Sequence, residues 1–394
     1  MTNKVLFLVI LYFLVQPCLS GQSNLDQLKT RAQNEFVNGE YAKALELYNQ
    51  CLNEDEERHD CRMGIGKTAR ILGDMTTARK AFMKLEKLDA YQTDCWKSLA
   101  SIYETEENRP KAIKYYTLLY GVDSTNAFTT RKLGQLYQQS GSIEEAFMFY
   151  SEAYGLNPND LFTTKGLAEI FIANDQNADA DSLLLIGLER DSTIASLNLL
   201  YARSQYQQRK YQEVTHILER VSHTAGMSSY FEKMLGYSYM QIDSLDKAIY
   251  FLNKALTTDS NPENALYYLA IAHERFEDPD AAKFYYQKAI ESGTSDNLDL
   301  YYRQLARLAI DEGDQRKAID SYEDALRYES STDIIFKLAR LYDEYYKDKS
   351  VALRYYRRYL NRSDAETEYV QYARARMTQL RSEQHMKKPR TASN

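Results

Sequence analysis

Three residues near the start of the chain, Gly66-Lys67-Thr68, match the end of the glycine-rich motif that binds nucleotide phosphates. That motif requires another glycine five residues before Gly66, where this chain has Cys61. The motif also follows a strand, whereas the acidic segment 54–57 comes before it here. We therefore interpret these three residues as structural, because Gly66 also belongs to a repeated pattern described below.

The histidines offer no better candidate for chemistry. They are His59, His216, His223, His273 and His385. No two of them flank a glutamate at the spacing of a zinc-peptidase helix, and nothing nearby completes a ligand set around the pair at 216 and 223. We expect no catalytic residue, no metal and no cofactor. An enzyme that depends on His216 or His273 remains an alternative.

Composition limits the classes of partner. The net charge at pH 7 is −7, whereas proteins that bind nucleic acid present basic surfaces to the phosphates. We therefore expect no nucleic-acid partner. The 394 residues include only 15 glycines and 6 prolines, so few positions interrupt helices. The 34 tyrosines require a structural explanation.

A period of 34 residues runs through most of the chain. One column of the repeat contains only alanine or glycine: Ala32, Gly66, Ala100, Gly134, Ala168, Ala202, Gly236, Ala270 and Ala306. A second column runs from Ala44 to Ala352 and is nearly always alanine, with a bulky residue four positions after each member. The spacing within one period predicts two short antiparallel helices, whose small residues let the backbones approach closely.

These residues resemble a known family. The columns Leu133, Gly134, Tyr137, Ala146, Tyr150, Ala153 and Pro158, and their counterparts 34 residues earlier, resemble the tetratricopeptide repeat. The resemblance implies an all-α, right-handed superhelical solenoid of about ten helix-turn-helix repeats over residues 22–363. We expect a capping helix at 364–382 and a disordered tail at 383–394. We also expect the least regular packing at residues 174–221.

The N-terminal residues predict export. Lys4 precedes the apolar run 5–15, and the small residues Cys18 and Ser20 follow it, which is typical of a secretory signal peptide over residues 1–21. An uncleaved membrane anchor is an alternative, although the run is short for a bilayer span. A lipoprotein signal at Cys18 is another.

Removal of the signal would leave three cysteines. An odd number excludes complete internal pairing. We expect Cys51, Cys61 and Cys95 to be small buried apolar residues rather than members of a disulfide.

A basic column precedes the leucine of the first helices by two positions. Six of its nine members are cations: Lys29, Lys97, Arg131, Lys165, Lys233 and Arg303. The resemblance implies that this column faces a concave groove, together with Gln135, Gln138, Tyr206 and Tyr237. No asparagine follows these cations by four residues, so a clamp for a terminal carboxylate is not indicated. The alternative is that each cation pairs with a carboxylate of a neighbouring unit, which contributes only ~0–1 kcal/mol at a surface.

We expect a non-enzymatic scaffold outside the cytoplasm that binds other proteins or peptides. The groove would take an extended, acidic or polar segment. The alternative is a structural subunit of a cell-envelope or secretion complex, associated with the envelope peripherally and binding through its convex face and ends. The sequence does not predict the oligomeric state.

Overall fold

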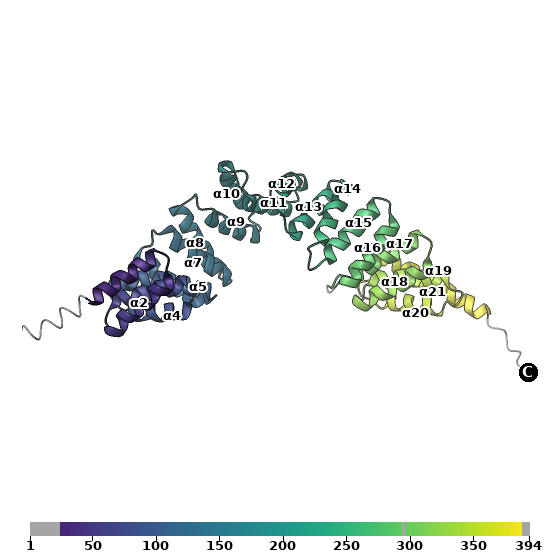
Figure 1. Ribbon diagram of the computed structural model, residues 1–394. Coiled ribbons are helices and arrows are strands. Elements are labelled where there is room, and N and C mark those ends of the chain that lie inside the picture. Colours follow the sequence, from purple (N-terminus) through teal and green to yellow (C-terminus); the bar gives the residue numbers. More distant parts are fainter. Residues whose placement is uncertain (1–23, 294–295, 388–394) are drawn as a thin grey trace, which may run out of the picture. The chain divides into compact units, whose positions relative to one another are not determined.

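The computed structural model describes residues 24–293 and 296–387, and within them the chain is helical with no strand (Figure 1). The all-α expectation is confirmed. The chain divides into two compact units at Ser192 and Thr193, inside the region expected to pack least regularly. The predicted signal peptide lies outside the described residues.

Unit 1 contains five helix pairs among its described residues. The first pair joins a helix over residues 24–37 to α2, and each later pair joins two consecutive helices. The bounds are α2 (Tyr41–Glu54), α3 (His59–Ile71), α4 (Met75–Leu85), α5 (Asp89–Thr105), α6 (Arg109–Val122), α7 (Ala127–Gln139), α8 (Ile143–Leu156), α9 (Leu161–Ala173) and α10 (Asn177–Arg190).

Unit 2 contains five more pairs and a final helix among its described residues. The bounds are α11 (Ala195–Gln207), α12 (Tyr211–Thr224), α13 (Ser229–Gln241), α14 (Leu245–Leu256), α15 (Glu263–Arg275), α16 (Pro279–Ser292), α17 (Leu298–Asp311), α18 (Gln315–Tyr328), α19 (Thr332–Tyr345), α20 (Ser350–Leu360) and α21 (Thr367–Lys387). In both units the second helix of one pair packs against the first helix of the next, which gives a stack of hairpins.

Helix α21 closes the stack of unit 2. Its Ala373, Met377 and Leu380 are buried against α19 and α20. The helix continues to Lys387, so the boundary that we placed after residue 382 is five residues too early. The rest of the expected tail lies outside the described residues. None of the helices described combines the length and the apolar character that a bilayer crossing requires.

A left-handed residue ends the first helix of nine pairs. Positive φ angles occur at residues Gly39, Gly73, Glu107, Gly141, Asp175, Arg209, Asp243, Glu277 and Gly313. Successive members are 34 residues apart, except for the last, which follows by 36. This conformation reverses the chain after a helix, and glycine adopts it without the steric cost that other residues meet.

Rings of the second helices fit against glycines of the first helices. The Tyr150 ring of α8 lies between Gly134 of α7 and Gly166 of α9. A Cβ atom added at Gly166 would lie 2.4 Å from Tyr150 Cζ, and one added at Gly134 would lie 2.9 Å from the ring. The small column therefore accommodates the bulky column, both within a pair and between pairs.

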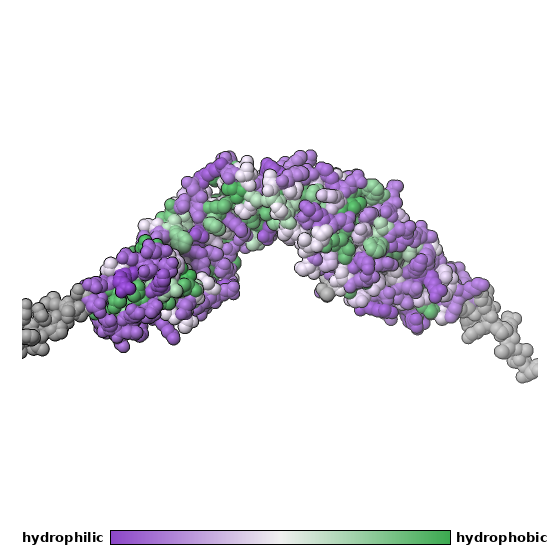
Figure 2. All heavy atoms as spheres, viewed as in Figure 1, coloured by the Kyte–Doolittle hydropathy of each residue, from purple (hydrophilic) through white to green (hydrophobic). Residues whose placement is uncertain are grey.

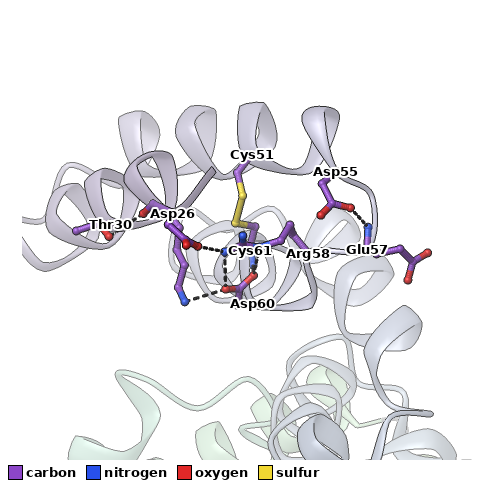
Figure 3. The surroundings of a disulfide bond; sticks show 9 residues. Asp26, Thr30, Cys51, Asp55, Glu57, Arg58, Asp60 and Cys61 are labelled. Atoms are coloured by element: carbon purple, nitrogen blue, oxygen red, sulfur yellow. Dashed lines mark hydrogen bonds and ion pairs between the residues drawn. A yellow bond between two sulfur atoms is a disulfide. The ribbon is translucent and has the colours of Figure 1, made fainter. Parts of the chain in front are cut away.

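The expectation for Cys51 and Cys61 was wrong, because these two residues form a disulfide (Figure 3). Cys51 lies on α2 and Cys61 on α3, ten residues apart in sequence, with 6.4 Å between their Cα atoms. Cys51 and Cys61 fall in different columns of the repeat, and the turn between the two pairs of helices brings these columns together. Cys95 is buried and free, as expected.

Candidate partner-binding surfaces

The first helices of successive pairs touch one another in both units. Helix α7 contacts α9, and α13 contacts both α11 and α15. We call the surface that these first helices form with the basic column the inner wall of each unit. It is the surface that the sequence predicts as the binding site.

A hollow of about 330 Å³ opens on the inner wall of unit 1. It is lined by Arg131, Gln135, Gln138 and Gln139 from α7, Tyr150 from α8, and Phe162, Lys165, Gly166 and Glu169 from α9. We call it the α7–α9 pocket. Four of the ten residues predicted from the sequence lie in it.

Arg131 is held in place on three sides. Its guanidinium carbon lies 5.2 Å from the Phe128 ring centre and 5.0 Å from that of Phe162. Its Nε lies 3.2 Å from Asp160 Oδ2. Asp160 also accepts the backbone N–H of Thr163 at the start of α9, so the carboxylate is itself fixed. Both phenylalanine rings are more than half exposed, which leaves apolar surface beside the cation.

Side-chain amides line the middle of the pocket. The Tyr150 hydroxyl donates to Gln138 Oε1 at 3.0 Å, and Gln138 Nε2 donates to Glu169 Oε2 at 3.2 Å. Lys165 Nζ lies 3.7 Å from the other oxygen of Glu169. An amide presents both a donor and an acceptor, which is what the backbone of an extended peptide requires. The pocket thus combines two cations and one carboxylate with three glutamines.

Carboxylates pair with five of the six cations of the basic column, as in the alternative that the sequence left open. Lys29 binds Asp60 at 2.8 Å, Lys233 binds Asp259 at 2.7 Å, and Arg131 binds Asp160. These three pairs link a first helix to the entrance of the next pair of helices.

Arg303 pairs within its own helix, with Asp299 at 3.7 Å, as Lys165 does with Glu169. Lys97 is exposed on α5, and no carboxylate in the described part of the chain lies within ion-pair distance of it. Carboxylates therefore neutralise most of the basic column. Among the described residues, its unpaired positive charge lies at Lys97.

A cluster of tyrosines lies beside the basic column on the inner wall of unit 2. Tyr237 lies at the centre, with ring centres 5.8 Å from Tyr206, 5.9 Å from Tyr211 and 4.8 Å from Tyr268. Burial, and then the neighbouring phenols, raise the pKa values of Tyr206 and Tyr237, so both hydroxyls remain neutral donors near neutral pH.

A hollow of about 160 Å³ adjoins this cluster. It is lined by Tyr206, Tyr230, Lys233, Met234, Asn264 and Tyr268. Two of the predicted residues, Tyr206 and Lys233, thus meet in it, whereas Tyr237 contacts Tyr206 but does not line the hollow.

The sequence reasoning missed several lining residues. Phe162 and Tyr230 fall outside the columns that we followed, although a search for exposed aromatic residues beside the basic column would have found both. Gly166 has no side chain, which leaves room for the Tyr150 ring beside the pocket. This close contact between the two residues is visible only in three dimensions. Within the described residues, no group of three His, Cys, Asp or Glu side chains could hold a metal ion.

Two segments match family models that are both described as tetratricopeptide repeat, residues 132–160 and residues 264–292. The first contains four of the nine residues that line the α7–α9 pocket, and the second begins at Asn264 in the smaller hollow. The comparison with curated proteins found no match.

The chain is similar to several solved structures. One is a tetratricopeptide repeat protein from Parabacteroides merdae ATCC 43184, with a TM-score of 0.46 and 16% identity, covering 64% of this chain and 98% of that one. Another is pilF of Pseudomonas aeruginosa, with a TM-score of 0.44 and 22% identity, covering 54% and 95%. A third is YrrB, described as a TPR protein with an unusual peptide-binding site, with a TM-score of 0.42 and 14% identity, covering 47% and 94%.

Proposed function

This chain is a tetratricopeptide-repeat protein, and we propose that it is a non-enzymatic scaffold that captures an extended segment of a partner protein on its inner walls. Such repeats generally bind other proteins or peptides. The α7–α9 pocket is the observation that carries the proposal, because it gathers four residues of the predicted site. The segment would donate to and accept from the glutamine amides through its backbone.

The charge of the pocket supports an acidic segment. Arg131 and Lys165 line it, and although Asp160 and Glu169 already pair with them, both cations keep further N–H donors from which a partner aspartate or glutamate would accept. Arg131 is already oriented by Phe128 and Phe162, so binding costs little of its side-chain entropy. The exposed rings beside it would cover apolar atoms of the same segment, as aromatic and arginine side chains do at protein interfaces.

Two features support a location outside the cytoplasm. The first is the predicted signal peptide, and the second is the Cys51–Cys61 disulfide, because disulfides persist in oxidising compartments and are rare in the cytosol. N-terminal sequencing of the protein from its native source should begin at Gly21 or Gln22. Thiol labelling under denaturing conditions should find one free cysteine. A retained N-terminus or three free thiols would contradict export.

Peptide selection tests the choice of partner. A random library of extended peptides, displayed on phage and selected on the immobilised mature chain, should become enriched in Asp and Glu. Lys165→Glu reverses a charge in the pocket and should weaken binding of the best peptide at least tenfold. Lys347→Glu makes the same change at an exposed position of unit 2 and should have no effect. Enrichment of basic peptides, or equal binding by Lys165→Glu, would overturn the proposal.

The assembly-subunit alternative makes a different prediction. A permanent subunit would be held in its complex by a large apolar interface and would copurify with that complex in high salt. Binding of a segment in the α7–α9 pocket would instead weaken as salt screens the charges.

A further inference from the structure

Unit 1 has a second hollow, of about 420 Å³, away from the inner wall. It is lined by Asn49 and Leu52 from α2, Arg62 and Ile65 from α3, and Thr77, Lys80, Ala81, Met83 and Lys84 from α4. We call it the α2–α4 groove. We propose that this groove binds an acidic amphipathic helix of a partner protein.

The groove is a different surface from the α7–α9 pocket. The basic column passes through Met63 on α3, and residues on a helix are about 100° apart around its axis. Ile65 therefore lies about 200° from Met63, on the opposite side of α3. The other lining residues come mostly from α2 and α4, which are the second helices of their pairs. A partner on the inner wall would leave the groove open.

The groove has an apolar floor that helix packing only partly covers. Ile65 and Ala81 belong to the buried cluster of the first pairs, and Leu52 packs against that cluster. Met83 forms part of the wall and is 45% exposed. In Figure 2 the face shown is mainly hydrophilic, with hydrophobic residues scattered among the hydrophilic ones. An apolar hollow at the surface is suited to the apolar side chains of a docked helix.

The rim of the groove is basic. Three of its nine lining residues are cations and none is a carboxylate. Lys80 and Lys84 are exposed and one helical turn apart on α4, which contains no Asp or Glu. None of the three cations has a carboxylate of the described residues within ion-pair distance. The chain as a whole has a net charge of −7, so three cations without neighbouring carboxylates are a local exception. They make the rim complementary to an acidic partner.

Arg62 adds a second indication. Its Nη2 donates to the backbone carbonyl of Glu56 at 2.7 Å, but its Nε is buried without a hydrogen-bond acceptor in the described structure. A buried donor without an acceptor is costly, and an incoming carboxylate could accept from this guanidinium. The groove is open along α4 rather than closed into a tunnel, which favours a helix over an enclosed lipid chain.

The probes for the test are three labelled peptides of equal length that contain the same number of leucines. The first is an amphipathic helix with leucines at i, i+3, i+4 and i+7 and glutamates elsewhere on its surface. The second replaces each glutamate by lysine, and the third scatters the leucines around the helix. Fluorescence anisotropy with the whole mature chain should detect binding of the first peptide only, and added salt should weaken it.

Variants locate the binding. Lys80→Glu/Lys84→Glu should raise the dissociation constant at least tenfold, and Met83→Asp should raise it as well. Lys347→Glu/Arg354→Glu reverses two exposed charges in unit 2 and should leave the first peptide unaffected. Because Lys165→Glu tests the inner wall, either proposal can fail alone. Circular dichroism of each variant confirms that the chain remains folded.

Three results would overturn the inference. Equal binding of the basic or the scattered peptide would exclude the proposed chemistry. Unchanged binding by Lys80→Glu/Lys84→Glu would exclude the groove. Binding to phosphatidylglycerol vesicles that is lost in the same variant, with no peptide binding, would assign the groove to a lipid surface.

Discussion

The glycines beside aromatic rings are where residue size matters most. Gly64 faces the Tyr48 ring, Gly66 faces the ring of Phe82, and Gly166 faces that of Tyr150, each at a distance that no Cβ atom could occupy without a shift. A glycine within a helix costs about 1 kcal/mol relative to alanine. The close contact offsets that cost by allowing the ring to bury fully.

Gly166→Ala should destabilise unit 1. The added methyl group would lie 2.4 Å from Tyr150 Cζ, so the ring or α9 must move, at a cost of about 1–3 kcal/mol that exceeds the gain in helix propensity. Gly155→Ala on α8 is the matched control, because no atom lies within 4 Å of the new Cβ. It should stabilise the unit by up to about 1 kcal/mol. Urea unfolding measures both changes, and equal effects would contradict the packing argument.

Asp60 makes stability depend on pH. Burial pushes the pKa of Asp60 upward, but hydrogen bonds from Arg58, Lys29 and the Cys61 backbone N–H outweigh burial and lower it to about 2 (Figure 3). In an unfolded chain an aspartate titrates near about 3.9. The stabilising contribution is therefore fully present above about pH 4 and is lost as the pH falls toward 2.

Asp60→Asn should remove this contribution. At pH 6 the free energy of unfolding of unit 1 should fall by about 1–2 kcal/mol, and the difference from the parent protein should shrink as the pH falls through about 2 and vanish below it. Glu54→Gln removes an exposed carboxylate on α2 and should show no such pH-dependent difference. Chemical denaturation at a series of pH values gives the two curves, and parallel curves for Asp60→Asn would argue against the ion-pair origin.

At the scale of the helix, several turns within pairs could be made more stable by a single substitution at the left-handed position. Five of the nine left-handed positions are not glycine, and Glu107 is exposed among them. Glu107→Gly should stabilise unit 1 by up to about 1 kcal/mol, because relief of left-handed strain exceeds the added entropy of the unfolded chain. Gly73→Ala, which has open space around its Cβ, should destabilise it by a similar amount. Urea unfolding of the two variants measures both changes. Opposite shifts of the unfolding midpoint would show that the backbone conformation at this position determines the stability of the turn.

The helices were predictable because the residue types in their columns repeat, whereas the features that were missed leave no repeat of residue types. The spacing of Ala146, Tyr150 and Ala153 is enough to place α8, and the same columns place its partners. The left-handed position also recurs, at intervals of 34 residues and once of 36, but four residue types occupy it, so its period is hidden in the sequence. The disulfide occurs once, between different columns, and a periodic search cannot find it.

The candidate surface was predictable as a column but not as a pocket. The basic column includes Arg131 and Lys165, which meet in one pocket. Which cations are neutralised depends on Asp60, Asp160 and Asp259, at three different offsets from their partners. Those offsets follow from the turns between pairs, so the charge left over on the inner wall emerges only from the folded chain.

For the whole molecule, the two units of the described chain consist of hairpins that pack mainly on their neighbours along the sequence. In such an array the free energy of unfolding is close to a sum of repeat and nearest-neighbour contributions. A local change should therefore lower stability near its own position and leave distant repeats unaffected. The Cys51–Cys61 disulfide allows this to be tested, since it can be opened without changing a residue.

Reduction of the disulfide should loosen the first two pairs alone. The disulfide closes a loop of about ten residues and lowers the conformational entropy of the unfolded chain. This stabilises the folded state by about 2–3 kcal/mol, and reduction removes that stabilisation. Hydrogen exchange under reducing conditions should show faster exchange in α2 and α3, less change in α5, and none in unit 2. Cys51→Ser/Cys61→Ser should already exchange at the faster rate and should not respond to the reductant. Faster exchange across α13 to α20 on reduction would mean that the chain unfolds as one cooperative block, because nearest-neighbour coupling cannot carry a loss in α2 that far.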